Sequence, residues 1–191
     1  MKLDQGWKLR LAVLATLVKL APQQLGRTAL MKFAYLLQTC KGIPLGYKFA
    51  LYNYGPYDGT VLSDLSQAET LRMIKSRMVQ YQSGNVGYQY STTKACDALC
   101  QVVGDELLRY DAEINWVIAQ FGSSSAADLE LISTIVFAER EIRRKTNVVS
   151  RSELSRRVEA IKPHFDDETI GEKIDNLHEL HLIGQLMKRA S

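Results

Sequence analysis

Cysteine, proline and histidine are scarce in this chain, and their scarcity limits the kinds of protein it can be. The 191 residues include three cysteines, four prolines and three histidines. The cysteines are Cys40, Cys96 and Cys100. Their number is odd and no two of them form a CxxC motif, so no disulfide framework is predicted. Cys96 and Cys100 lie one helical turn apart and could supply half a metal site, but we favour their interpretation as small buried apolar side chains.

Long apolar runs and common catalytic motifs are also missing. No run of about eighteen uncharged apolar residues occurs, because Lys8, Arg10 and Lys19 interrupt the apolar stretch near the start. We therefore expect no membrane partner and, with unpaired thiols, a cytoplasmic location. No glycine-rich phosphate loop or nucleophile motif is present, and His178 and His181 lack a third ligand at zinc spacing. The sequence predicts no catalytic residues, no cofactor and no metal site.

What remains is an ordinary globular composition with an uneven charge distribution. Hydrophobic residues make up 46% and charged residues 24% of the chain, which argues against disorder. Residues 1–125 carry thirteen Lys/Arg and nine Asp/Glu, whereas residues 126–191 carry eleven and twelve. An anionic partner should therefore bind the first part. The Gly-Ser-Ser-Ser stretch at 122–125 predicts a boundary between a domain at 1–121 and a smaller domain at 126–191 packed on it.

Apolar periodicity and turn chemistry predict a mainly α (α+β) chain. In the first domain we expect helices at 7–20, 27–40 and from Pro56 to about Glu69, and an extended segment at 47–54. A hairpin follows at 73–82 and 86–92, and then a long helix at 94–121. This order is typical of a winged helix-turn-helix-like domain whose wing is the β-hairpin. Three helices are expected in the second part, one of them beginning at a Ser150/Glu153 capping box.

The hairpin and its flanks are the strongest candidate for binding nucleic acid. Residues 72–94 contain four basic and no acidic side chains, interleaved with tyrosines. A basic ribbon with a small tip can follow a phosphate backbone and release counterions. The alternative is a solvated hairpin whose tyrosines only pack on the helices. The candidate residues are Arg72, Lys75, Arg77, Tyr81, Asn85, Tyr88 and Lys94.

The third helix favours a different class of partner. Its polar positions include Asp58, Asp64 and Glu69 but no basic residue, so we expect phosphates to repel it. It could instead dock a protein, together with the tyrosine-rich segment before it. We expect Tyr52 and Tyr54 to close the core. The candidate partner-binding residues are Tyr47, Tyr57, Asp58, Asp64 and Gln67.

Three segments resemble known bacterial families. The helix at 25–37 and the Tyr-Gly-Pro at 54–56 are similar to the YwgA-like proteins and, more distantly, to the Panacea antitoxin domain; the residues at 129–134 also resemble the YwgA-like second half. The matching positions are Gly26, Arg27, Leu30, Lys32 (one place from the usual spacing), Tyr35, Tyr54, Gly55 and Pro56. The first resemblance implies an architecture, and the second implies neutralisation of a toxin by direct contact. Neither supplies catalytic residues.

Two functional hypotheses follow. The first is a non-enzymatic, winged-helix-like regulatory or defence-associated protein that binds DNA or another nucleic acid through the hairpin. The second is a protein-interaction module, an antitoxin or adaptor, whose partner is a protein such as a toxin. We also expect a homodimer with the 94–121 helix as its seam.

Overall fold

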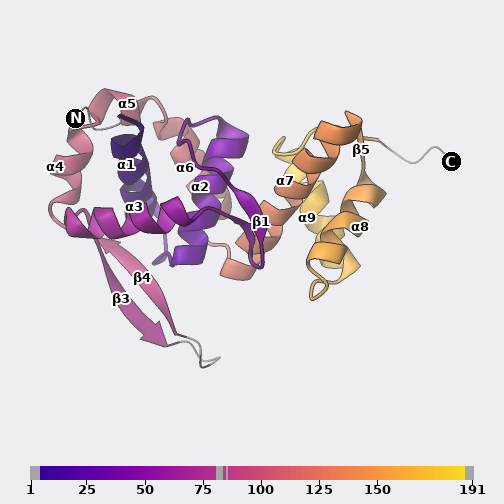
Figure 1. Ribbon diagram of the computed structural model, residues 1–191, viewed down its shortest axis with the longest axis horizontal. Coiled ribbons are helices and arrows are strands. Elements are labelled where there is room, and N and C mark those ends of the chain that lie inside the picture. The colour runs from indigo at the N-terminus through magenta and orange to yellow at the C-terminus, as the bar shows by residue number, and fades with distance from the viewer. Residues whose placement is uncertain (1–4, 81–83, 85, 188–191) are drawn as a thin grey trace. The chain divides into compact units, whose positions relative to one another are not determined.

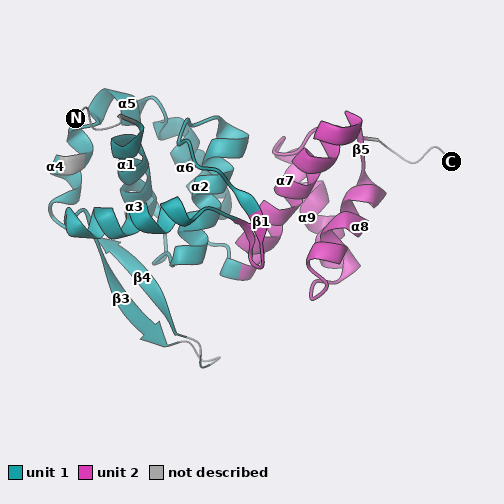
Figure 2. Cartoon of the chain, in the orientation of Figure 1, with its two compact units in different colours: residues 1–50, 57–126 teal, residues 51–56, 127–191 magenta. Residues whose placement is uncertain are grey.

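Helices predominate in the computed structural model, which describes residues 5–80, 84 and 86–187 (Figure 1). One antiparallel hairpin with strands of seven residues and two shorter strand pairings complete the regular structure of this described part. The prediction of a mainly helical α+β chain is confirmed. The chain forms two compact units, residues 1–50 with 57–126 and residues 51–56 with 127–191 (Figure 2).

The first unit combines helices with the antiparallel hairpin. Its elements are α1 (Gln5–Leu20), α2 (Arg27–Lys41), α3 (Gly59–Thr70), β3 (Ile74–Gln80), β4 (Val86–Thr92), α4 (Cys96–Gln101), α5 (Gly104–Leu108) and α6 (Asp111–Phe121). Two short strands, β1 (Ala50–Tyr52) and β2 (Gly55–Tyr57), pair between α2 and α3. In Figure 1, β3 and β4 extend away from the helices of this unit.

Helix α1 is the centre of this unit. It contacts α2, α3, α4, α5 and α6 as well as β4. Its apolar residues are buried on more than one side, because Leu9, Val13 and Leu17 are as inaccessible as Leu11 and Leu14. A helix buried on several sides is stabilised mainly by the apolar surface that it removes from water. The periodicity at 7–20 correctly predicted the helix and underestimated how much of its surface is buried.

The prediction of one long helix at 94–121 is wrong. The segment forms the three short helices α4, α5 and α6, separated at Val102–Val103 and at Arg109–Tyr110. Two adjacent β-branched residues followed by Gly104 are poor helix formers, which accounts for the first break. The expected dimer seam therefore does not exist as one continuous helix.

Helix α3 begins later than predicted. Pro56 belongs to strand β2, and the helix starts at Gly59 behind its N-cap, Asp58. The Asp58 carboxylate accepts a hydrogen bond from the Thr60 backbone N–H at 2.8 Å, which is the usual way to satisfy a helix start.

The second unit contains helices and a parallel strand pair. Its elements are α7 (Ala126–Thr146), β5 (Val149–Ser150), α8 (Arg151–Ile161), α9 (Asp167–Glu179) and β6 (Leu186–Met187). Ser150 caps α8 as the capping box predicted, because its hydroxyl accepts from the Glu153 N–H at 3.2 Å. The parallel pairing of β5 with β6 was not predicted, since two-residue strands carry no periodicity. No helix in the described part of the chain is long and apolar enough to cross a membrane.

Residues 51–56 are held within the second unit by a buried ion pair. Lys162 is 1% exposed and its Nζ lies 2.5 Å from Glu130 Oε1. The same ammonium donates to the Asn53 carbonyl oxygen at 2.5 Å. A buried lysine needs such partners, because an unpaired charge in the interior is strongly unfavourable.

Gly55 lets this segment approach α7 closely. Its φ is +82°, and a Cβ at this position would lie 2.8 Å from Thr134 Oγ1. Tyr52 and Tyr54, which precede Gly55, are 64% and 70% exposed. The expectation that they close the core is therefore wrong, because the backbone and not the aromatic rings makes the close contact.

Replacing Gly55 by alanine should destabilise the second unit more than a positive φ alone would. A left-handed backbone costs an L-residue roughly 1–2 kcal/mol, and the added Cβ must also displace the buried Thr134 side chain. We expect a loss of about 3 kcal/mol in urea unfolding, combining the two costs. Gly42→Ala is the matched control, since Gly42 has φ +72° and open space around its missing Cβ. Equal losses in the two variants would contradict the close-contact argument.

Candidate nucleic-acid interface

The register of the hairpin separates its basic and its aromatic side chains. Lys75 pairs with Ser91 and Arg77 with Gln89, whereas Met78 pairs with Tyr88. Directly paired residues lie on the same face of an antiparallel ladder, and successive residues alternate between faces. Lys75 and Arg77 therefore share one face and Tyr88 and Tyr90 the other, although the sequence suggested one interleaved surface.

The segment before α2 lies along the outer edge of β4. The Tyr90 backbone N–H donates to the Leu25 carbonyl oxygen at 3.0 Å, outside the β3–β4 ladder. Leu25 and Tyr90 are each 2% exposed, so this contact is part of the core. The segment thereby extends the hairpin sideways and brings the first turn of α2 next to β4.

This arrangement brings an arginine from α2 onto the aromatic face. The Arg27 guanidinium carbon lies 3.6 Å from the centroid of the Tyr88 ring, and Arg27 Nε donates to Tyr90 Oη at 3.3 Å. Stacking on an aromatic face stabilises a cation and fixes its plane. The hydrogen bond with Tyr90 raises the pKa of Arg27, although burial opposes it, so the side chain stays cationic.

On the opposite face, Arg77 is also tied to the segment before α2. Arg77 Nη2 donates to Gln24 Oε1 at 2.8 Å and to Gln89 Oε1 at 2.9 Å. Both acceptors are neutral amides, so the guanidinium charge is not cancelled by these contacts. Arg27 and Arg77 thus lie on either side of one edge of the hairpin.

A groove of about 580 Å³ lies between the start of α2 and strand β4. Its lining is formed by Gln23, Gln24, Leu25, Gly26, Arg27, Thr28, Ala29, Val86, Gly87, Tyr88, Gln89, Ser124, Ser125 and Ala126. No acidic residue is among them, and the glutamines, hydroxyls and arginine offer several hydrogen-bond donors. Gly26 is the N-cap of α2 and has no side chain to cap the first turn, whose N–H groups therefore suit an anion.

Arg72, Lys75 and Lys94, which were also named from the sequence, are exposed. Lys75 lies on the outer face of β3, and Lys94 follows β4. Arg72 has φ 58° between α3 and β3, and its carbonyl oxygen accepts from the Thr93 hydroxyl. Tyr81 and Asn85 lie outside the described residues. Among the described members of the predicted set, only Tyr88 lines the groove, and Arg77 contacts two residues that do.

Sequence reasoning missed the contribution of residues 23–27 to this surface. Arg27 and Tyr90 are 63 positions apart and carry no local pattern that links them. A positive residue at the start of a helix is also unfavourable for the helix dipole, which is a physical signal that could have drawn attention to Arg27.

The acidic character of α3 is weaker than its sequence predicts. Asp64 is 1% exposed; its Oδ2 accepts from Arg10 Nε at 2.7 Å and from Tyr47 Oη at 2.8 Å. The expectation that Asp64 lies on an open docking face is therefore wrong. The helix turns this carboxylate inward, toward a cation on α1, instead of outward into solvent.

The remaining two carboxylates of α3 are also engaged. Burial raises the pKa of Asp58, but the Thr60 and Lys48 backbone N–H groups outweigh it and lower the pKa overall. Glu69 Oε1 accepts from the Ser76 N–H at 2.9 Å. The exposed positions of this helix are Gly59, Thr60, Ser63, Ser66, Gln67 and Thr70. This face is polar and uncharged, so the predicted electrostatic repulsion is much reduced.

Two other predicted partner residues have different environments. Tyr47 is 6% exposed beneath α3 and cannot contact a partner without local unfolding, because its hydroxyl is needed by Asp64. Tyr57 is 40% exposed, and Gln67 is exposed and accepts from the Trp7 indole N–H. The predicted docking set is therefore not one surface.

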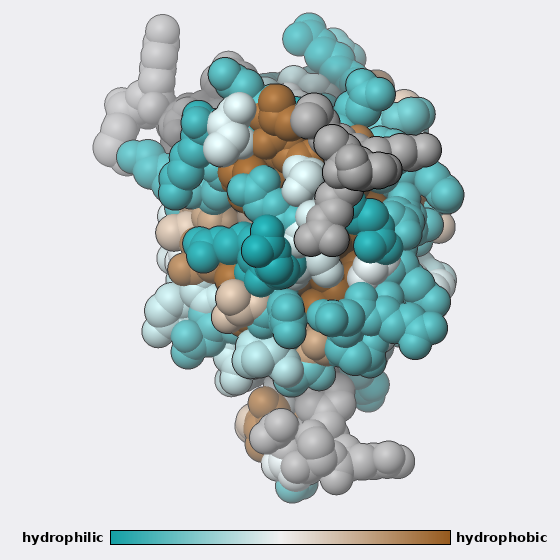
Figure 3. Space-filling view, turned by 90° about the vertical axis from the view of Figure 1, so that its right-hand side faces the viewer, coloured by the Kyte–Doolittle hydropathy of each residue, from teal (hydrophilic) through white to brown (hydrophobic). Residues whose placement is uncertain are grey.

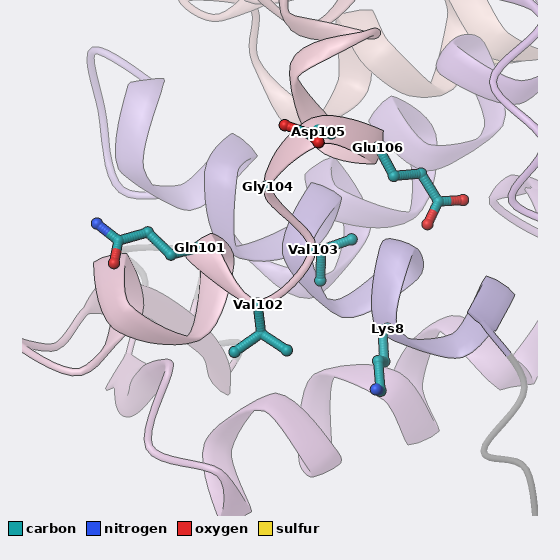
Figure 4. A pocket seen from close by; sticks show the side chains of 7 residues that line it. All are labelled: Lys8, Gln101, Val102, Val103, Gly104, Asp105 and Glu106. Atoms are coloured by element: carbon teal, nitrogen blue, oxygen red, sulfur yellow. The ribbon is translucent and has the colours of Figure 1, made fainter.

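A second hollow, of about 380 Å³, lies where the predicted long helix breaks (Figure 4). Lys8, Val102, Val103, Asp105 and Glu106 are among its lining residues. Figure 4 shows the Asp105 and Glu106 side chains pointing in different directions, so the carboxylates do not converge on one point. Within the described residues, no three His, Cys, Asp or Glu side chains are grouped to hold a metal ion.

The environment of Tyr47 predicts a specific loss of stability at high pH. Burial, and then the Asp64 carboxylate, raise the pKa of Tyr47 far above its ordinary value. Above about pH 10 the unfolded chain loses this proton, whereas the folded chain keeps it. The contribution of Tyr47 to the free energy of unfolding is therefore complete below about pH 10 and declines as the pH rises above it. The free energy of unfolding should fall less steeply above pH 10 in Tyr47→Phe, by up to about 1.4 kcal/mol per pH unit.

Urea unfolding between pH 9 and about pH 11 measures this difference. Tyr54→Phe is the matched control, because Tyr54 is 70% exposed, and it should follow the parent chain at every pH. If the free energy of unfolding falls equally with pH in Tyr47→Phe and in the parent, the Tyr47 phenol does not contribute to the loss of stability at high pH.

Comparisons of the sequence with known proteins identify no family. No family model matches the chain, and no curated protein is significantly similar to it.

Proposed function

We propose that this chain binds nucleic acid with a winged-helix-like first unit, through the groove between α2 and β4 and the basic face of the hairpin. The observation that carries the proposal is the pair Arg27 and Arg77. Arg27 lines a groove with no acidic residue among its described lining, and Arg77 hydrogen-bonds two of the lining residues, Gln24 and Gln89. Backbone phosphates are bound by such arginines, by neutral amides and hydroxyls, and by helix N-termini.

The order of elements supports the winged-helix-like part of the proposal. Helices α1, α2 and α3 are followed by the antiparallel hairpin β3–β4, with a short strand pair before α3. In such domains the third helix and the hairpin contact the nucleic acid. The exposed face of α3 carries threonines, serines and a glutamine, which are side chains that contact phosphates, sugars or base edges.

The biological role that we propose is regulatory or defence-associated, without catalysis. The resemblance of residues 25–37 and 54–56 to YwgA-like and Panacea segments supports this role.

Charge reversal of the two arginines tests the proposal. The double variant Arg27→Glu/Arg77→Glu should weaken binding to a mixed-sequence duplex at least about 100-fold at low salt, because two cationic contacts become repulsive. It should also reduce the slope of log K against log salt by about 2, if each arginine neutralises one phosphate. Fluorescence polarisation over a salt series measures both quantities.

The matched control is Arg156→Glu/Arg157→Glu, which changes the net charge equally at two exposed positions of α8. It should lose less than about 5-fold in affinity, because only long-range, screened electrostatics change. Equal losses in both double variants would mean that net charge and not the groove governs binding. Absence of binding by the parent chain at low salt would reject the proposed function.

A second candidate function is docking of a protein partner, as an antitoxin or adaptor. The observation that favours it is the exposure of Tyr52 and Tyr54, 64% and 70%, in a segment held by Gly55 and by the Lys162 hydrogen bond. Exposed tyrosines on a well-held backbone are frequent anchors of protein interfaces, because little conformational entropy is lost on binding. The surface in Figure 3 shows hydrophobic residues as separate patches among predominantly hydrophilic ones, which fits local anchors better than a broad apolar interface.

Tyr52→Ser/Tyr54→Ser should abolish stoichiometric co-purification of a protein partner from the native host, since both anchors are removed. Arg27→Glu/Arg77→Glu should leave that co-purification intact. A partner retained by the tyrosine variant, or a parent chain that is recovered alone, would count against docking at this segment. Quantitative mass spectrometry of the eluates gives the ratio of partner to bait.

A further inference from the structure

The Arg27 side chain is held against an aromatic ring inside the groove. Its guanidinium carbon lies 3.6 Å from the centroid of the Tyr88 ring, and its Nε donates to Tyr90 Oη at 3.3 Å. Tyr88 is half-buried, whereas Arg27 is exposed, and both residues line the groove. The Tyr88 ring therefore covers one side of the guanidinium plane, and the other side is open to the groove.

A guanidinium group held in this way is a platform on which a nucleobase can stack. Bases stack on aromatic rings and on arginine guanidinium planes, and every base has a face that suits this contact. Little conformational entropy is lost on binding, because Tyr88 and Tyr90 already hold the Arg27 side chain. The edge of the same group carries N–H donors, so Arg27 can bind a phosphate while its plane contacts a base.

The rest of the groove lining suits a base as well as a phosphate. The groove measures about 580 Å³, which lies within the roughly 300–1,000 Å³ of pockets that bury small ligands. Gln24 and Gln89 contribute amides, and amides pair with the hydrogen-bonding edges of bases. Their oxygens accept from Arg77, so a base acceptor would be bound by the amide N–H groups.

Apolar side chains continue from this platform along the same face of the hairpin. Met78 pairs directly with Tyr88 and is 69% exposed. Val86 lies two residues from Tyr88 on β4, which places it on the same face, and it is 60% exposed at the edge of the groove. Phosphates gain nothing from apolar side chains, whereas base faces and the thymine methyl group do. This face therefore suits contact with bases better than contact with the backbone alone.

A base can reach the Arg27 platform only when it is unpaired. In a double helix each base is stacked between its neighbours, and its face becomes accessible in a single strand or after extrusion. We infer that the groove binds a single strand of nucleic acid, with one unpaired base stacked on Arg27 and a phosphate held by the edge of the same side chain. This inference rests on the proposed function, which it narrows from nucleic acid in general to single strands.

A strand without bases separates stacking from phosphate binding. Fluorescence polarisation at one low salt concentration compares three labelled probes of equal length: a thymidine strand, an abasic strand and a duplex. The full-length chain should bind the thymidine strand at least about 10-fold more tightly than the abasic strand, which is the effect of one stacked base. It should also bind the thymidine strand at least as tightly as the duplex, although the duplex carries phosphates at higher density.

Arg27→Lys tests the platform directly, because it keeps the charge and removes the plane. The preference for the thymidine strand over the abasic strand should fall below about 3-fold, while the affinity for the abasic strand changes little. Tyr88→Leu, which removes the ring beneath Arg27, should change the preference in the same direction. Arg157→Lys is the matched control, since it makes the same exchange at an exposed position of α8, and it should retain the full preference.

Equal affinity of the parent chain for the thymidine and abasic strands would overturn the inference and leave the proposed function standing, because phosphates alone would then explain binding. A full preference in Arg27→Lys, or tighter binding of the duplex than of the thymidine strand, would also overturn it. A parent chain that binds none of the three probes would reject the proposed function and the inference together. Far-ultraviolet circular dichroism establishes that each variant is folded, and Arg27→Lys, at an exposed position, keeps the test decisive if Tyr88→Leu does not fold.

Discussion

The hydrogen bond from the Tyr90 N–H to the Leu25 carbonyl is the contact on which the proposed interface depends. A two-stranded hairpin alone is marginally stable in water, and its orientation must be fixed by the body that it joins. Here one buried backbone bond, with the Tyr90 ring beside it, attaches β4 to the segment before α2. Arg27 can stack on Tyr88 only because this attachment brings the two chain segments together.

The same packing determines the electrostatics of α3. A helix with three carboxylates and no basic residue repels phosphates if those carboxylates face solvent. In this chain Asp64 is neutralised by Arg10, Asp58 caps the helix, and Glu69 accepts from the hairpin backbone. The charges stabilise the fold, and the neutral hydroxyl and amide side chains occupy the outside. Counting charges along a sequence therefore overestimated the negative potential of this face.

Helices and strands that follow from the periodicity of apolar residues could be predicted from the sequence. Contacts between residues far apart in the chain could not. Helices α1, α2 and α9, the hairpin strands and the Ser150 cap follow from local patterns. The break at Val102–Gly104 was missed because apolar residues continue at helical spacing across it. The inward turn of Asp64 and the outward position of Tyr54 depend on partners far away in the chain, which a single sequence does not contain.

In the candidate site, the sequence revealed the basic hairpin but not the groove. Alternation along β3 and β4 places Lys75 and Arg77 on the face opposite Tyr88, so the interleaved pattern did not predict a mixed surface. The groove is formed by residues 23–29, 86–89 and 124–126, which are distant in sequence. Among the described residues, only Tyr88 belongs to both the predicted set and the lining.

In the proposed function, the small number of cations at the groove limits how tightly one copy of the chain would hold nucleic acid. Two arginines and one helix start engage roughly two or three phosphates, which corresponds to a salt slope near −2 to −3 and to weak, non-specific affinity. Proteins with such modules reach specific affinity by placing two copies on one duplex, with half-sites about one helical turn apart. The continuous helix predicted to join two copies is absent, because α4, α5 and α6 replace it. Tight binding by this chain therefore requires a second contact surface besides the groove, and the neutral outer face of α3 is the surface with suitable hydrogen-bonding groups next to the hairpin.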